Sequence, residues 1–146
     1  MSAETSSART ILVVDDDRHI VRLISYILEM AGYTVVEAAN GREALDLLAE
    51  HAASLTGDAA SLTPDLVICD IMMPELDGFA VVEAIRADPE TRELPVIMLT
   101  AKGEEKDIQR AQEVGANEYI TKPFSSSQVL ESVARHLGRS TNERSR

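Results

Sequence analysis

Six polar side chains of this sequence stand directly after apolar runs, in positions where they could take part in chemistry. They are Asp15, Asp16, Asp17, Asp70, Thr100 and Lys122. Carboxylates that are brought close together repel one another and raise each other's pKa unless a cation joins them. All the candidate metal ligands are carboxylates, and the sequence contains no cluster of His and Cys residues. The expected cation is therefore Mg²⁺.

Asp70 is the carboxylate of this set that could act as a nucleophile on phosphorus. With Asp15, Asp16 and Asp70 ionised, one Mg²⁺ and Lys122 bring the local formal charge close to zero. Metal and lysine would then neutralise the oxygens of an incoming phosphoryl group, while Thr100 donates a hydrogen bond. Taken alone, an acid after an apolar run is an ordinary turn residue. The combination of all these side chains favours the chemistry.

Five short apolar runs alternate with five segments of helical periodicity. Strands are expected over residues 11–14, 34–38, 66–69, 95–99 and 118–121. Helices are expected over residues 18–31, from Asn40-Gly41 to about residue 52, from residue 79 to Asp88-Pro89, over 104–114, and from a serine cap at 125–127 to Gly138. This order predicts an α/β fold, a doubly wound parallel sheet with helices on both faces. The candidate residues would then meet at the carboxyl edge of the sheet.

Composition and charge narrow the class of partner. A chain of 146 residues is expected to fold as one domain. The net charge of -11 and the pI near 4.6 argue against direct binding to nucleic acid or to an anionic membrane. No apolar run has the roughly 20 residues of a membrane helix, and the N-terminus lacks the apolar region of a signal peptide. The single Cys69 can form no internal disulfide, so a cytoplasmic location is expected.

The ends of the chain and one internal segment differ in composition from the rest. Residues 1–9 are expected to form a flexible arm, residues 10–138 the domain, and residues 139–146 a polar tail. Residues 53–63 are rich in Ala, Ser, Thr and Gly and form an insertion, either a loop or an extension of the preceding helix. The three histidines, His19, His51 and His136, fall on helix faces and are interpreted as solvated.

Five motifs with characteristic spacing resemble a known family. They are Asp15-Asp16 after a Val-Val strand, Asp70 with Met73-Pro74 and Asp77-Gly78 downstream, Thr100-Ala101, and Tyr119 three residues before Lys122-Pro123-Phe124. Together they closely resemble the CheY-like receiver domain of bacterial two-component response regulators. The resemblance covers about Thr10 to Leu137. It implies a five-stranded flavodoxin-like sheet with strand order 2-1-3-4-5.

The resemblance also implies roles for individual residues at the acidic edge. Asp70 would accept a phosphoryl group from a sensor histidine kinase or a phosphotransfer protein. Asp16 and Asp70 would bind Mg²⁺ directly together with the backbone carbonyl of Met72, and Asp15 would act largely through water. Met72 and Lys102 occupy the positions that tune dephosphorylation in this family. The lifetime of the phosphoryl group is therefore left open.

A second set of residues would contact the phosphoryl group and transmit its presence. Thr100, Ala101 and Lys122 would contact the phosphoryl oxygens, and Thr100 and Tyr119 would form a switch pair. The peptide between Lys122 and Pro123 is typically cis in this family. Phosphorylation would change the surface formed by residues 104–114, the strand over 118–121 and the last helix. This change would control a downstream protein target or an output domain.

Several alternatives remain open at this level. The resemblance allows a phosphorylation-dependent homodimer, but Ser132 stands where winged-helix regulators usually carry an arginine for dimer pairing. A haloacid-dehalogenase-like phosphatase would need an acid where Met72 stands, and no P-loop motif occurs. The domain is therefore expected to catalyse only its own phosphorylation and dephosphorylation. A phosphate-independent interaction module is the stronger alternative. The sequence does not separate a stand-alone protein from the receiver of a longer regulator.

Overall fold

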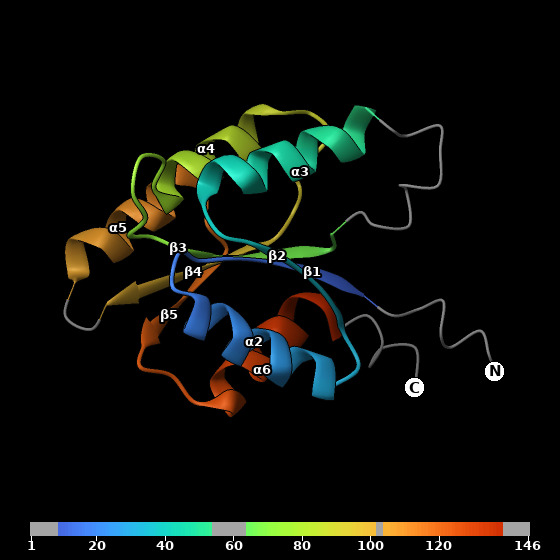
Figure 1. Cartoon of the computed structure of the whole chain (residues 1–146). Helices are drawn as coiled ribbons and strands as arrows, with labels where there is room; N and C mark the ends of the chain where they lie inside the picture. Colours follow the sequence, from blue (N-terminus) through green and yellow to red (C-terminus); the bar gives the residue numbers. More distant parts are fainter. Residues whose placement is uncertain (1–8, 54–63, 102–103, 139–146) are drawn as a thin grey trace.

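The computed structural model describes residues 9–53, 64–101 and 104–138 (Figure 1). Strands and helices alternate along the chain in the order expected from the sequence. They are β1 (Thr10–Val14), α2 (Arg18–Met30), β2 (Thr34–Ala38), α3 (Gly41–Ala53), β3 (Leu66–Asp70), α4 (Gly78–Ala87), β4 (Val96–Ala101), α5 (Glu105–Val114), β5 (Glu118–Lys122) and α6 (Ser126–Val133), which continues into a π-helical turn (Ala134–Gly138). All four strand pairings are parallel, and the strand order is β2-β1-β3-β4-β5. The predicted flavodoxin-like fold is confirmed.

Two separate apolar cores lie on the two faces of the sheet. In Figure 1, α3, α4 and α5 cover one face and α2 and α6 cover the other. Successive strand residues point to opposite faces, so Leu12 and Val14 pack with the first layer, whereas Ile11 and Val13 pack with the second. Because both faces are covered, the three central strands β1, β3 and β4 are apolar over most of their length, and this explains the uninterrupted apolar runs of the sequence.

Side chains at the helix ends explain where several helices begin. The Asp17 carboxylate accepts a hydrogen bond from the backbone N–H of His19 at the start of α2, and Asp77 accepts one from Ala80 at the start of α4. Ser125 and Gln128 form a reciprocal capping box at the start of α6. In contrast, Glu104 gives α5 no side-chain cap. The end of α5 that follows β4 is therefore less firmly fixed than the starts of its neighbours.

Arg86 fastens the opposite end of α5 to the rest of the domain. Its guanidinium donates to the carbonyl oxygens of Gly115 at 3.0 Å and Leu94 at 2.7 Å, and to the side-chain oxygen of Asn117 at 2.8 Å. Asn117 also accepts a hydrogen bond from the backbone of Val96 at the start of β4. One arginine thus joins α4 to the segments before β4 and after α5.

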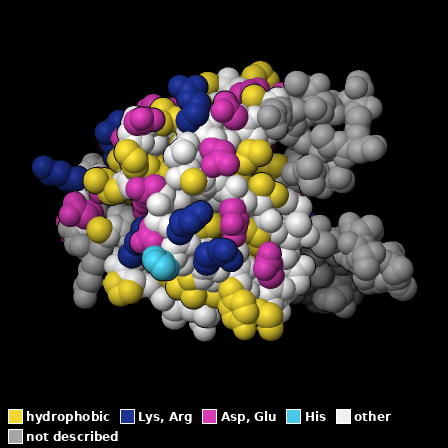
Figure 2. Space-filling view, in the orientation of Figure 1, with side chains coloured by type: hydrophobic (Ala, Val, Ile, Leu, Met, Phe, Trp, Pro, Cys, Tyr) yellow, Lys and Arg dark blue, Asp and Glu magenta, His cyan; other side chains and the backbone are white. Residues whose placement is uncertain are grey.

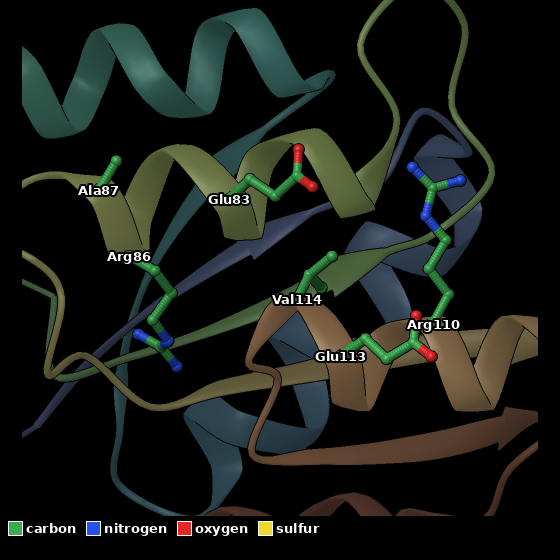
Figure 3. A pocket seen from close by; sticks show the side chains of 6 residues that line it. All are labelled: Glu83, Arg86, Ala87, Arg110, Glu113 and Val114. Carbon is green, nitrogen blue, oxygen red and sulfur yellow. The ribbon is translucent and has the colours of Figure 1, made fainter.

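A shallow groove separates α4 from α5 beside this arginine. Figure 3 shows that the lining side chains come from these two helices, with Arg86 and Arg110 at opposite ends. The Arg110 guanidinium lies 4.6 Å from the centre of the Phe79 ring, a cation–π contact between α5 and α4. Within α5 only Ala111 is buried. Besides Ala111 and the partly buried Val114, the contact of Arg110 and the hydrogen bond of Arg86 to Gly115, at the C-terminal end of the helix, hold α5 in place, and its apolar anchoring is sparse, as its sequence pattern suggested.

Acidic and basic side chains are interspersed on the face of the molecule shown in Figure 2. The imidazole of His136 lies 2.8 Å from the Glu118 carboxylate, which also binds Arg135. The side chain of His136 is only 22% exposed. The interpretation of His136 as solvated was therefore wrong, because β5 and α6 bring an acid beside it. His19 is exposed, as expected.

Other expectations about the chain meet the structure only in part. Cys69 is fully buried inside β3, as expected for a small apolar residue. Ser132, on α6, is also buried. The expected N-terminal arm up to residue 8, the insertion from residue 54 onward and the tail after residue 138 lie outside the described residues. Across the described part of the chain, no helix is both long enough and apolar enough to cross a membrane.

Candidate functional site

The carboxyl edge of the sheet brings three carboxylates together. Asp15 follows β1, Asp16 is its neighbour, and Asp70 ends β3. One oxygen of each side chain lies within 4.8 Å of the oxygens of the other two. Asp15 and Asp70 are buried, at 1% and 4% exposure, whereas Asp16 is exposed. The cluster thus opens to solvent on the side of Asp16.

Lys122, at the end of β5, reaches two of these carboxylates. Its ammonium nitrogen lies 3.0 Å from Asp70 Oδ1 and 3.3 Å from Asp15 Oδ2. Residues 107 positions apart in the sequence are therefore in direct contact at the site. The parallel register of β1, β3, β4 and β5 makes this possible, because it places the carboxyl ends of all four strands at one edge.

Burial makes the charged form of Asp70 unfavourable. Removal from water raises the pKa of Asp70 to about 6, although the hydrogen bond from Lys122 acts in the opposite direction. Burial likewise raises the pKa of Asp15, and the backbone N–H of Asp17 and the charge of Lys122 limit the rise. Lys122 and the hydrogen bonds balance the negative charges of these two carboxylates only in part. A further positive charge would stabilise both in the ionised form.

The charges and ligands of the site fit a divalent cation. Burial by itself would lower the pKa of Lys122, but its hydrogen bond to Asp70 and the nearby carboxylate charges outweigh burial and raise it. Lys122 is therefore protonated at neutral pH, and three ionised carboxylates leave a formal charge of about -2 at the site. The ligand atoms are all oxygens, which Mg²⁺ prefers. An acidic pocket for a divalent ion is thus present.

The backbone around Asp70 is held from both sides. The Ile71 N–H donates a hydrogen bond to the Leu99 carbonyl at 3.1 Å, and the Gly78 N–H donates one to the Ile71 carbonyl at 2.9 Å. A Cβ atom at Gly78 would overlap the carbonyl oxygen of Asp70. Only glycine allows this approach, so the loop after β3 folds tightly back onto the acidic residue. The sequence motif contained Gly78 but did not reveal this role.

The expected phosphoryl-contacting and switch residues lie near the ends of the last two strands. Thr100 is buried at the end of β4, and its hydroxyl has only a 3.5 Å contact with the Ala101 carbonyl, at the outer limit of a hydrogen bond. Ala101 is exposed beside it. Tyr119, on β5, is 38% exposed. The Thr100 hydroxyl is therefore weakly held, and the Tyr119 ring is partly in solvent.

Two further expected residues lie on the loops that flank the site. The side chain of Met72, after β3, is 67% exposed, so its predicted contribution is confined to the backbone carbonyl. The peptide between Lys122 and Pro123 is cis. Glu75, between Met72 and Gly78, has a φ of 67°, a conformation unusual for a residue with a side chain. Nothing in the sequence pattern had singled out Glu75.

Comparisons with known proteins agree with the fold and the site. The family model described as "Response regulator receiver domain" matches residues 11–134. The DNA-binding dual master transcriptional regulator RpaA of Synechocystis sp. is 40% identical over 129 residues, which cover 88% of this chain and 49% of the relative. The alkaline phosphatase synthesis transcriptional regulatory protein PhoP of Bacillus subtilis is 42% identical over 132 residues, or 90% of this chain and 50% of the relative.

A solved structure is similar over almost its whole length. The crystal structure of a putative response regulator from Chloroflexus aurantiacus has a TM-score of 0.79 and 34% identity, covering 90% of this chain and 98% of that one. By contrast, this chain spans about half the length of the curated relatives it matches. Family match, fold and acidic pocket lead to the same assignment. The chain belongs to the response regulator receiver domains of two-component systems.

Proposed function

We propose that Asp70 accepts a phosphoryl group in a Mg²⁺-dependent reaction and that this modification is the signal the domain transmits. The observation that carries the proposal is the contact of Lys122 with two buried carboxylates at the carboxyl edge of the sheet. In the reaction, an Asp70 oxygen forms a bond to phosphorus while the bond between phosphorus and the donor atom breaks. The electron pair of that bond leaves with the donor, which takes up a proton.

Asp16 and Asp70 would hold the metal ion together with the Met72 carbonyl, and Asp15 would act largely through water. The ion supplies positive charge that stabilises the oxygens of the phosphoryl group during transfer. The two raised carboxylate pKa values support this role, because buried acids that lack compensating charge favour a cation.

Lys122, Thr100 and Ala101 would hold the transferred group. Lys122 already lies 3.0 Å from Asp70, so its ammonium needs little movement to contact a phosphoryl oxygen. The Thr100 hydroxyl makes only a long contact within the chain and is available to donate a hydrogen bond. The proposed switch then follows, with Thr100 turning to the phosphoryl group and Tyr119 turning inward from its partly exposed position.

The surface that would respond consists of α5, β5 and α6. The sparse anchoring of α5 supports a rearrangement there, because few buried contacts would have to be broken. A sensor histidine kinase or a phosphotransfer protein would supply the phosphoryl group, and a downstream protein or an output domain would read the altered surface. A phosphorylation-dependent homodimer through this surface is part of the same proposal.

Relatives that carry the word transcriptional in their names are about twice as long as this chain. For the chain itself we propose a signalling role with no catalysis beyond its own phosphorylation and dephosphorylation, and no direct contact with nucleic acid or membrane. A cytoplasmic location stays a prediction from the sequence. The rival function is an interaction module that works without phosphate.

Intact-mass spectrometry after incubation with acetyl phosphate tests this proposal. Wild type with Mg²⁺ should gain the mass of one phosphoryl group, and EDTA should abolish the gain. The Asp70→Asn variant should gain none. Asp46→Asn, at an exposed position on α3, is the matched control and should be phosphorylated like wild type.

Two results would overturn the proposal. Phosphorylation of Asp70→Asn to the wild-type level would place the acceptor elsewhere. A folded wild-type protein that binds Mg²⁺ but takes up no phosphoryl group would favour the phosphate-independent module. Binding of Mg²⁺ is measured separately by titration calorimetry on the same samples.

A further inference from the structure

One segment of the candidate site, the loop between β3 and α4, has few hydrogen bonds of its own. This β3–α4 loop comprises residues 71–77 and carries the Met72 carbonyl that we propose as a metal ligand. Among the described residues, the only backbone hydrogen bond within the loop runs from the Leu76 N–H to the Pro74 carbonyl, at 2.7 Å. The position of the Met72 carbonyl therefore depends largely on what the loop packs against.

The first residue of α3 lies directly against this loop. Gly41 is buried, and a Cβ atom at this position would lie 2.8 Å from the carbonyl oxygen of Leu76. It would also lie 2.8 Å from a methyl carbon of Val81, on α4. Real Cβ atoms essentially never make contacts this short, so only glycine lets the loop approach α3 so closely. Figure 1 shows α3 and α4 on the same face of the sheet.

The start of α3 is itself firmly held. The Asn40 side chain accepts a hydrogen bond from the Glu43 N–H at 2.8 Å. The Glu43 carboxylate in turn accepts one from the Ala39 N–H at 2.7 Å. Reciprocal side-chain hydrogen bonds of this kind fix the first turn of a helix. Gly41 therefore presents a rigid surface to the loop.

The connection from β2 to α3 also contacts the other half of the acidic site. The Ala38 carbonyl, at the end of β2, accepts a hydrogen bond from the backbone N–H of Asp15 at 3.3 Å. A little further along the chain, Gly41 lies against the loop that follows Asp70. One short connection thus relates the part of the acidic site on β1 to the part that follows β3.

We propose that Gly41 is a positioning residue for the metal site, because its lack of a side chain lets α3 hold the β3–α4 loop and keeps the Met72 carbonyl in place. This inference rests on the proposed function and adds a residue on which metal binding depends. Gly41 itself touches neither metal nor phosphoryl group and acts through Leu76. Mg²⁺ demands near-ideal octahedral geometry with ligands at about 2.0 to 2.1 Å, so a small displacement of one ligand weakens binding.

Alanine at position 41 would displace the loop. The new Cβ atom would meet a backbone oxygen and a methyl group of the fully buried Val81, and neither has room to turn away. Leu76 packs against the same apolar core as Met73, the neighbour of Met72. Closely packed interiors transmit strain, so a displacement of Leu76 is passed on through Met73 to the Met72 carbonyl.

Calorimetric titration with metal ions tests the proposal in Gly41→Ala. We expect the Kd for Mg²⁺ to rise about tenfold, the lower end of the effect of residues that orient metal ligands. The Kd for Ca²⁺ should rise much less, because Ca²⁺ accepts longer and more variable ligand distances. A variant that is only partly folded would lose both ions alike. In uptake from acetyl phosphate, the Mg²⁺ concentration that gives half the maximal rate should rise by the same factor.

Two further comparisons separate the loop contact from a general loss of stability. Gly32→Ala is the matched control, because Gly32 has a φ of 100° and lies before β2, at the opposite edge of the sheet from the acidic site. This variant should be less stable in urea and yet keep the wild-type Kd for Mg²⁺. Gly41→Ala/Val81→Ala removes the contact with the Val81 methyl group and leaves the one with the Leu76 carbonyl. Its Kd should therefore stay about tenfold above that of Val81→Ala alone.

A Gly41→Ala protein that does not fold would move the test to Leu76→Ala. This variant keeps Gly41 and removes the Leu76 side chain, one of whose methyl carbons lies 3.1 Å from the Cβ position of residue 41. It loosens the same contact from the side of the loop, and its Kd for Mg²⁺ should rise several-fold while that for Ca²⁺ changes less. An unchanged Kd for Mg²⁺ in the folded variant would overturn the inference.

The outcomes separate this inference from the proposed function. Wild-type affinity for Mg²⁺ in Gly41→Ala, or equal losses for Mg²⁺ and Ca²⁺, overturns the inference and leaves the function standing. Recovery of the Kd in Gly41→Ala/Val81→Ala also overturns it, because the effect then comes from the packing of α3 on α4. If Gly41→Ala loses Mg²⁺ affinity as expected but wild type takes up no phosphoryl group, the function fails and the inference stands. Absence of Mg²⁺ binding by wild type overturns both.

Discussion

Replacement of the proposed acceptor carboxylate, Asp70, should stabilise the metal-free protein, although it removes the central residue of the candidate site. Burial raises the pKa of Asp70 from 3.8 to about 6. A shift of about 2 pKa units corresponds to roughly 3 kcal/mol by which the folded state disfavours the ionised form. Asparagine has nearly the shape of the protonated acid and carries no charge. We therefore expect Asp70→Asn to raise the free energy of unfolding by about 2 to 3 kcal/mol above pH 7 without metal.

The pH dependence of this difference follows from the direction of the pKa shift. Between pH 3.8 and 6 the folded wild type binds a proton at Asp70 that the unfolded chain has released, so its stability falls as the pH rises. The full penalty is present above pH 6, shrinks as the pH falls, and disappears below about pH 3.8. The stability of Asp70→Asn relative to wild type should follow the same course.

Urea unfolding of both proteins with EDTA, at several pH values between 4 and 8, measures the difference. Saturating Mg²⁺ should then stabilise wild type more than Asp70→Asn, because the variant lacks one of the proposed ligands. An Asp70→Asn protein that is less stable than wild type at pH 7.5 with EDTA would refute the reasoning. It would mean that the ion pair with Lys122 outweighs the burial of the carboxylate.

The remaining predictions concern the supports of the site and of the helices. Gly78→Ala should lower the free energy of unfolding by about 3 kcal/mol in urea, since its Cβ would overlap a backbone oxygen that cannot easily move; a loss below 1 kcal/mol would show that the loop relaxes freely. Arg86→Met should cost about 3 kcal/mol and increase amide hydrogen exchange around Gly115, because several carbonyl groups lose their donor; unchanged exchange there would argue against its fastening role. Ser125→Ala should cost about 1 kcal/mol, the usual value of a helix cap, and Ser127→Ala is the neighbouring control.

The fold could be predicted from the sequence because both faces of every central strand are covered. Runs such as Leu66 to Cys69 then contain no polar residue and can be recognised directly. Polar residues that follow these runs must lie at one edge, and Asp70 and Lys122 are indeed in contact. The periodicity of the sequence thus predicted both the strands and helices and the edge of the sheet at which the site residues lie.

Features that depend on contacts between distant residues could not be predicted in this way. Nothing in the sequence around His136 indicates that Glu118, on a different element, lies 2.8 Å away. The network of Arg86 is equally hidden, because its acceptors are mostly backbone oxygens, which every residue has. Backbone contacts of this kind leave no pattern of residue types.

The separation of the two apolar cores has a consequence for how this domain can vary. Val13 and Val14 are neighbours in β1, yet each packs into a different core and shares few partners with the other. Substitutions in one core should therefore combine additively with substitutions in the other, whereas those within one core are coupled. The layer that carries α2 could be repacked, in evolution or by design, while the layer that carries α4 and α5 is left intact. One sheet thus carries two helical layers that can change separately, with α2 and α6 in one layer and α3, α4 and α5 in the other.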